Sequence, residues 1–247
     1  MKPRKKYSGI PALLFWIGVW WLGALGIRNP LLLPTPLEVF QCLLELGSTG
    51  QFWQTVALSI GRILLGVVTA VGLGVLLAIL STRSRLAELL IDPAITAMQA
   101  TPVASFTILV LIWLDRDWVP VLICTMMALP VVFTGVSTGI RNVDPQLPEM
   151  ARVFKLSRPR ILLRIWLPSV MPFFRTACSS ALGLGWKAGI AAEVLTVPRV
   201  SMGRMIAESK LYLMTPELFA WTVTVVALSL ALQRIMLALL KKGDRNA

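Results

Sequence analysis

The sequence predicts an all-α membrane protein with about six transmembrane helices, and three observations support this class. Hydrophobic residues make up 56% of the 247 residues and charged residues only 15%, with a mean hydropathy of +0.76, which is more apolar than a soluble domain. Several apolar segments are long enough, at about 1.5 Å per residue, to cross about 30 Å of hydrocarbon. The basic residues gather in alternate connections between these segments, as they do in multi-pass proteins.

Composition also excludes several classes of function. The chain has no histidine, which is the commonest general base and metal ligand, so we expect no catalytic residues and no metal site. Cys42, Cys124 and Cys178 are too dispersed for a disulfide framework or a zinc site, and we expect them to be small apolar fillers. The net charge of +12 would suggest nucleic-acid binding in a soluble protein, but in a membrane protein basic residues mark the cytoplasmic side. We therefore expect no nucleic-acid partner.

The N-terminal part predicts one span and one surface helix. Residues 7–27 are apolar and follow Lys2, Arg4, Lys5 and Lys6, which should stay inside. A cleaved signal peptide is the alternative, but the apolar run is too long and no small-residue cleavage site follows it. In residues 32–47, a cap at Thr35, a proline at the first helical position and Glu38 predict a short amphipathic helix on the outer membrane surface.

Five more segments are predicted to cross the membrane, and the whole chain reads as one membrane domain, residues 1–247. The spans are expected at about residues 55–80, 94–114, 119–140, 169–192 and 218–240. The segment 169–192 contains polar groups that we expect to face neighbouring helices rather than lipid. We therefore divide the domain into an N-terminal span with its outer helix (1–54), a core bundle (55–240) and a cytoplasmic loop (141–168).

The distribution of charge tests this layout and places both termini on the inner side. Outside the predicted spans, most of the 24 Lys and Arg residues fall on that side. The basic residues assigned to the outer side are few: Arg28, Arg116, Arg199, Arg204 and Lys210.

The loop 141–168 is too long and too regularly patterned to be a simple connection. Asp144 and Pro145 predict the start of one short helix, and Ser157 the start of a second, which Pro168 should separate from the next span. The first helix carries an apolar stripe, and the second carries three arginines beside an apolar face. Two interpretations stay open, namely helices resting on anionic lipid and an element that docks on a partner. The stripe consists of Leu147, Met150, Ala151 and Phe154.

Residues in this loop resemble the cytoplasmic signature of bacterial ABC import permeases, which is Glu-Ala-Ala, three residues, Gly, nine residues, then Ile-x-Leu-Pro. The spacing is kept throughout, and the matching residues are Glu149, Ala151, Ile165, Leu167 and Pro168. Met150 replaces an alanine and Lys155 replaces the glycine. Lysine adopts a left-handed conformation less readily than glycine, so the turn at Lys155 is expected to differ.

The resemblance covers about residues 31–240 and is nearest to the branch that imports nitrate, sulfonates, taurine and related small compounds. Other matching stretches are Leu33-Pro34-Thr35-Pro36, Ser59-Ile60-Gly61-Arg62, Asp92-Pro93 and Ala191-Ala192-Glu193. It implies a type I ABC importer permease bundle in the bacterial cytoplasmic membrane, working as a pair with two ATPases and an external solute-binding protein. It also implies that the segment from Glu149 through Leu156 to Ser157 is the coupling helix.

No cofactor is expected on the chain itself. It contains no Gly-x4-Gly-Lys-Ser/Thr phosphate loop, so ATP and Mg²⁺ are expected on the partner ATPase. Movement of that ATPase would pull the docked helices and switch the side to which the central cavity opens.

Charged and polar residues inside the spans are candidates for the translocation pathway. Arg62 and Lys187 are placed at a similar height near the outer surface, where they would guide an anion or, alternatively, pair with Glu193, Asp115 or Asp117. Polar residues in the third span indicate an irregular helix that lines a cavity or packs against a neighbour. These are Gln99, Thr101 and Ser105.

Two other functions compete with the ABC importer. An ion-gradient-driven carrier or channel would use the basic loop to bind lipid. An intramembrane enzyme is disfavoured because histidines and a carboxylate cluster are missing.

Overall fold

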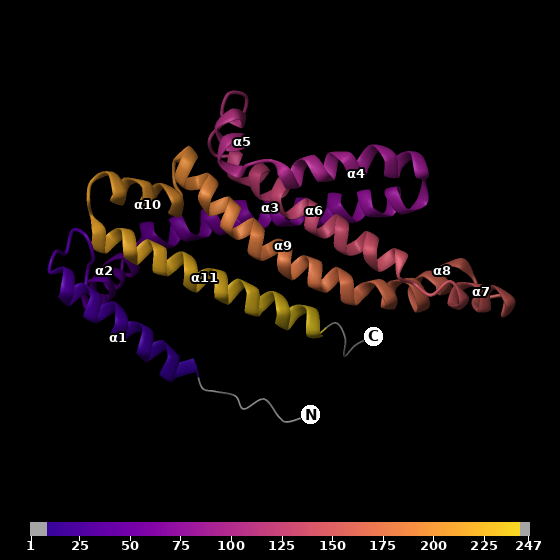
Figure 1. Ribbon diagram of the computed structural model, residues 1–247, viewed down its shortest axis with the longest axis horizontal. Helices are drawn as coiled ribbons and strands as arrows, with labels where there is room; N and C mark the ends of the chain where they lie inside the picture. The colour runs from indigo at the N-terminus through magenta and orange to yellow at the C-terminus, as the bar shows by residue number, and fades with distance from the viewer. Residues whose placement is uncertain (1–8, 243–247) are drawn as a thin grey trace.

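The structure is a computed structural model that describes residues 9–242, and within that range helices joined by turns and loops are its only regular secondary structure. The four long helices α3, α6, α9 and α11 run along the longest axis of the molecule, with α2 and α10 at one end and α7 and α8 at the other (Figure 1). The helices are α1 (Gly9–Ile27), α2 (Pro36–Gly47), α3 (Gly50–Arg83), α4 (Arg85–Ala100), α5 (Val103–Val110), α6 (Val119–Arg141), α7 (Gln146–Val153), α8 (Arg158–Ile161), the π-helical turn η1 (Leu162–Trp166), α9 (Leu167–Thr196), α10 (Met202–Leu211) and α11 (Thr215–Lys242).

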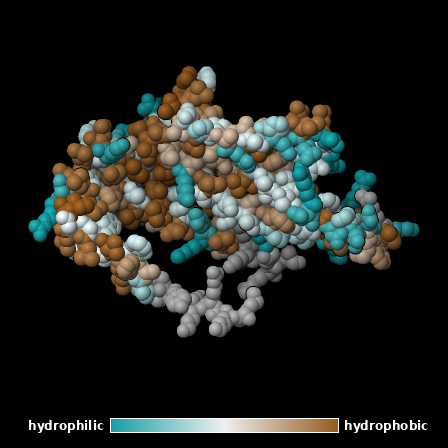
Figure 2. Space-filling view, viewed as in Figure 1, coloured by the Kyte–Doolittle hydropathy of each residue, from teal (hydrophilic) through white to brown (hydrophobic). Residues whose placement is uncertain are grey.

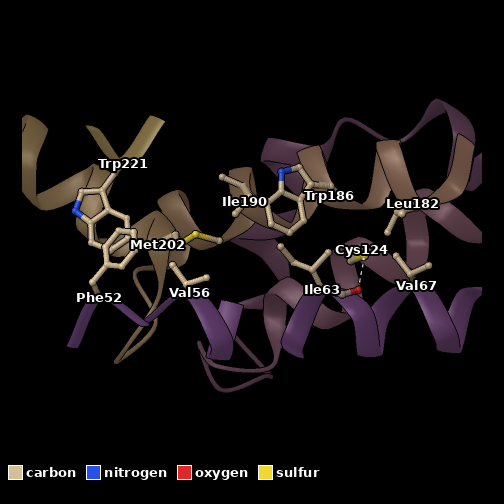
Figure 3. Close-up of a cluster of buried hydrophobic side chains, with 10 residues drawn as sticks. All are labelled: Phe52, Val56, Ile63, Val67, Cys124, Leu182, Trp186, Ile190, Met202 and Trp221. Carbon is tan, nitrogen blue, oxygen red and sulfur yellow. Dashed lines mark hydrogen bonds between the residues drawn. The ribbon is translucent and has the colours of Figure 1, made fainter. Parts of the chain in front are cut away.

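The core lies where α6 packs between α3 and α9, and small residues allow these helices to approach closely. A Cβ atom added to Gly66 of α3 would lie 2.7 Å from the Cβ of Cys124 on α6. A Cβ atom on Gly189 of α9 would lie 2.7 Å from Ile63 Cγ1 on α3. Figure 3 shows the apolar side chains that meet there, with the Cys124 thiol donating to the Ile63 carbonyl at 3.4 Å.

Two of the three cysteines fill buried space as expected, and Cys42 is half-buried. Cys124 and Cys178 are buried, and all three thiols are free. Among the described residues, no cluster of His, Cys, Asp and Glu is arranged to hold a metal ion.

Within residues 9–242, four helical segments are long and apolar enough to cross a membrane, or five if the bent pair α4 and α5 counts as one span. The four are Gly50–Arg83, Val119–Arg141, Arg158–Thr196 and Thr215–Ala238. α1 is the shorter apolar helix of the N-terminal part, and most of its side chains are exposed. The described residues thus contain an apolar helix at each of the six predicted spans, with the third broken. The basic residues 2–6 lie outside the described part of the chain.

The third predicted span, residues 94–114, is wrong as a single regular crossing. The helix begins earlier, at Arg85, includes Pro93 and ends at Ala100, and α5 then leaves at an angle of 102° to α4. Pro102 has no N–H to continue the ladder, and it holds Thr101 in an extended conformation at φ −73° and ψ 122°. α5 packs instead against α9, where Val110 lies in a cluster with Ala188 and Ala192.

The predicted short helix is confirmed as α2, and its place on a membrane surface stays a prediction. The Glu38 N–H donates to the Thr35 hydroxyl at 3.3 Å, and the Thr35 N–H donates to the Glu38 carboxylate at 2.8 Å, which completes a capping box. Leu37, Phe40 and Leu44 remain exposed on one side, as an amphipathic helix at a membrane surface requires.

Candidate functional site

The loop after α6 forms a projection beyond the bundle, at the right-hand end of Figure 1. The Asp144 carboxylate accepts the Gln146 N–H at 2.9 Å and so caps α7, which begins at Gln146 rather than at Pro145. α7 packs extensively against none of the other described helices. Figure 2 shows apolar and polar surface mixed on this projection.

The apolar stripe of α7 is largely free, with one exception. Met150 is 54% exposed, Phe154 72% and Leu147 39%, and Glu149 beside them is exposed too. Ala151 was predicted to belong to this stripe, but it is 3% exposed and faces the protein. Val153, 80% exposed, takes its place in the free surface. The predicted stripe and the free face overlap but are centred at different angles around the helix axis, so the Ala151 edge of the stripe meets the protein.

Lys155 adopts the left-handed conformation that the signature glycine would favour, with φ at 52°. The Leu156 N–H donates to the Ala151 carbonyl at 3.0 Å, which is the bond that closes a Schellman turn at a helix C-terminus. The expectation that lysine would change this turn is therefore wrong. The backbone bond that ends α7 holds lysine in a conformation that glycine would adopt without steric cost.

Replacing Lys155 with glycine is expected to stabilise the loop. A left-handed residue with a Cβ costs about 1–2 kcal/mol, of which the greater freedom of unfolded glycine offsets about 0.4–1 kcal/mol. The thermal unfolding midpoint of the detergent-purified Lys155→Gly variant should rise by about 2 °C. The matched control, Lys155→Ala, keeps the Cβ and should not rise. A lower midpoint for the glycine variant would contradict the strain at this position.

The second half of the loop differs from its prediction at two places. Ser157 precedes α8 as predicted, but its side chain makes no capping bond. Pro168 does not separate this helix from the fifth span, because α8, η1 and α9 form one apolar helix from Arg158 to Thr196. The Leu167 N–H reaches back to the Leu162 carbonyl in a π-helical turn, which accommodates the missing N–H of Pro168 without a break. Ile165 thus lies in η1 and Leu167 is the first residue of α9, so both belong to this one continuous helix.

At the opposite end of the bundle, Arg62 of α3 is bound to acidic and carbonyl groups. Its Nη2 lies 2.9 Å from the Asp117 carboxylate, and its Nη1 donates to the Val200 carbonyl at 2.6 Å. Nη1 is also 3.7 Å from Oε1 of Glu193 on α9. Of the two roles predicted for Arg62, guiding an anion and pairing with an acidic residue, the structure shows the pairing.

Glu193 is completely buried and holds the start of α10 in place. Its Oε2 accepts the Ser59 hydroxyl at 2.8 Å and the Gly203 N–H at 3.1 Å. The Ser59 oxygen in turn accepts the Met202 N–H at 2.9 Å, so two of the first amides of α10 are satisfied from α3 and α9. We call Ser59, Arg62, Asp117, Glu193 and their partners on α10 the Arg62 cluster.

Lys187 lies at a height similar to that of Arg62, because Gly189 touches Ile63, but it faces another side. Its side chain is exposed on α9, and it has no ion pair within the described residues. The two cations that the sequence grouped together therefore have different surroundings.

A cavity of about 660 Å³ lies between α4, α6 and α9. Gln99 lines it, as a pathway candidate should, whereas Thr101 and Ser105 are not among its lining residues. Thr134, Thr138 and Thr176 also line it, although no sequence motif indicated them, and so does Ser180, one of the polar residues of the segment 169–192. Their recurrence at helical spacing on α6 and α9 was the available signal. The lining residues are Gln99, Val131, Thr134, Gly135, Thr138, Pro172, Phe173, Thr176, Ala177 and Ser180.

The apolar bundle and its broken span have the character of a helical membrane protein with a projecting loop. The family described as the binding-protein-dependent transport system inner membrane component matches residues 70–242, and the chain belongs to this family. The chain is 29% identical to the putative aliphatic sulfonates transport permease protein of Bacillus subtilis (strain 168), over 88% of this chain and 80% of that protein.

Two further relatives are transport permeases. The taurine transport system permease protein of Escherichia coli (strain K12) is 26% identical over 97% of this chain and 89% of its own length. The bicarbonate transport system permease protein of Synechococcus elongatus is 25% identical over 95% and 90%.

Among solved structures, an amino acid ABC transporter crystallised with histidines matches with a TM-score of 0.64 at 16% identity, covering 83% of this chain and 98% of that chain. The chain thus has the all-helical fold of a type I ABC permease.

Proposed function

We propose that this chain is the transmembrane subunit of an ATP-driven importer, and that residues 147–157 dock on a separate cytoplasmic ATPase. The observation that carries this proposal is the free apolar face of α7, with Met150 54% and Phe154 72% exposed at the tip of a projection. A pair of large apolar side chains held outside the bundle on a capped helix suits insertion into a groove of a partner. The continuous helix from Arg158 to Thr196 would carry the movement of that partner into the core.

The translocation pathway is proposed to follow the polar face of α4, α6 and α9. Exposed polar groups in membrane-crossing helices are costly against lipid, so this face needs a partner other than hydrocarbon. A second copy of the chain, related by a two-fold axis, would cover it and enclose the pathway between the two subunits. Gln99 and Lys187 are the predicted pathway residues that face this side, and we assign Arg62 and Glu193 to holding its outer end. Thr101 and Ser105 flank the bend between α4 and α5.

The solute is proposed to be a small compound carrying an oxyanion, because the relatives are permeases named for sulfonates, taurine and bicarbonate. An extracytoplasmic solute-binding protein would deliver it to the end formed by α2 and α10. ATP and Mg²⁺ would bind only to the ATPase.

The cytoplasmic side is assigned to the end that bears the α7 projection. Arg83, Arg85 and Arg141 lie at this end, where the positive-inside rule places basic residues. Both termini are then cytoplasmic, in a bacterial cytoplasmic membrane whose lipid surrounds the exposed apolar helices.

Uptake into liposomes tests this function. The chain, reconstituted with its ATPase and binding protein, is expected to import ethanesulfonate only when ATP is enclosed with the ATPase domains. Omitting the ATPase, or replacing the lysine of its phosphate loop, should abolish uptake. Uptake that persists without the ATPase and follows an ion gradient would overturn the proposal in favour of a carrier.

A further inference from the structure

The exposed face of α9 carries a line of polar side chains within an otherwise apolar span. Thr176, Ser180 and Lys187 are all exposed and, at 100° per residue, lie within about 40° of one another around the helix axis. Ser180 and Lys187 are about 10 Å apart along the axis at 1.5 Å per residue. Thr176 and Ser180 line the cavity, and Lys187 lies two turns beyond it toward the outer end.

Hydrogen-bonding groups inside the cavity are unusually free. Hydroxyls elsewhere in the bundle, such as those of Thr107 and Ser137, donate to the carbonyl one turn back. In the cavity only the Thr176 hydroxyl does so, to Pro172 at 3.0 Å. The side chains of the other polar lining residues make no hydrogen bond within residues 9–242, and they are Gln99, Thr134, Thr138 and Ser180.

The charge around these groups favours an anion. No Asp or Glu lines the cavity, so nothing there would repel a negative solute. Arg62 is engaged by Asp117, Glu193 and a carbonyl, whereas the Lys187 ammonium has no acidic partner within the described residues. An unpaired ammonium at membrane depth needs a counter-charge or water, and its flexible stem can reach either way along α9.

We propose that Lys187, together with the free donors of the cavity, forms an anion-binding subsite in the permease itself. Its ligand class is a small organic solute with a sulfonate or comparable oxyanion group. The inference rests on the proposed function and extends it, because charge would then be selected in the membrane as well as by the external binding protein. Lys187 supplies the charge and the hydroxyl and amide groups supply directional hydrogen bonds.

Equilibrium dialysis of labelled ethanesulfonate tests the subsite on the full-length protein in lipid nanodiscs, with the ATPase where it co-purifies. Lys187→Gln is expected to weaken binding about tenfold or more, as loss of one charge-assisted hydrogen bond predicts, while Lys187→Arg should keep most of it. Lys210→Gln, which removes an exposed cation from α10, is the matched control and should bind normally. Ser180→Ala should weaken binding less than Lys187→Gln, since it removes a neutral donor.

The uncharged analogue ethyl methyl sulfone separates charge from size and should not compete. Equal binding by wild type and Lys187→Gln, equal competition by the sulfone, or no binding by wild type would each overturn the subsite. Binding is measured without ATP, so its failure is distinct from a failure of ATP-driven uptake, which would overturn the importer function instead.

Discussion

Phe154→Asp is expected to abolish co-purification of the ATPase while leaving the chain folded in the membrane. The side chain is 72% exposed at the end of α7, so its replacement costs the permease little internal packing. In the complex it would lie in a desolvated pocket, where loss of a large apolar anchor costs about 2–4 kcal/mol and a buried carboxylate costs more. Affinity for the ATPase should fall at least about thirtyfold, and uptake with it.

The measurement is the yield of ATPase bound to affinity-tagged permease, compared at equal amounts of permease. Met150→Asp should behave like Phe154→Asp, and Glu149→Ala tests the charged neighbour in the signature. Leu211→Asp is the matched control, because Leu211 is 73% exposed at a helix end on the opposite side of the molecule. A full yield of complex with Phe154→Asp would refute the docking role of α7.

Arg62→Met is expected to destabilise the protein strongly. It would leave Glu193, which is completely buried, with an uncompensated charge and would release the Val200 carbonyl and Asp117. Removing one partner of a buried ion pair costs about 3–5 kcal/mol. Because Arg62 and Glu193 contact each other in the Arg62 cluster, the double variant Arg62→Met with Glu193→Gln should lose less stability than the sum of the losses in the two single variants.

Unfolding midpoints of the detergent-purified variants, followed by tryptophan fluorescence, measure this coupling. The control is Arg199→Met, whose side chain is 82% exposed at 3.9 Å from Asp117 and whose loss should have little effect. Additive losses of stability in the double variant, or an unchanged unfolding midpoint for Arg62→Met, would show that the Arg62 cluster does not hold α10.

Two separate stretches of the sequence that resemble the family meet in the Arg62 cluster. Ser59 and Arg62 come from one stretch and Glu193 from another, and the structure brings them together across α3 and α9. The sequence placed Arg62 at a suitable height and offered Glu193, Asp115 and Asp117 as partners, and the structure selects Asp117 and Glu193. Lys187 was placed at a similar height, yet it lies on a different side. The sequence could not show this, because the rotation of an apolar helix about its axis leaves little trace in its hydropathy.

Local chemistry was sufficient wherever a feature depends on neighbouring residues. The capping box of α2, the capping of α7 by Asp144 and the apolar length of most spans follow from side chains within a few positions of one another. The bend at Pro102 was indicated only as an irregularity, since its 102° angle depends on α5 packing against α9. The left-handed turn at Lys155 was judged from residue preference, which the surrounding backbone bonds override.

By itself, the sequence determined that this is an apolar helical protein of the importer-permease type with a patterned loop, because membrane crossing, capping and loop signatures are local properties. Only the tertiary structure decided that Arg62 is paired, that Ala151 faces the protein, and that free polar groups gather around one cavity. Those outcomes depend on how helices far apart in the chain rotate and pack against each other. Nearly uniform apolar faces leave that choice to close contacts such as Gly66 with Cys124.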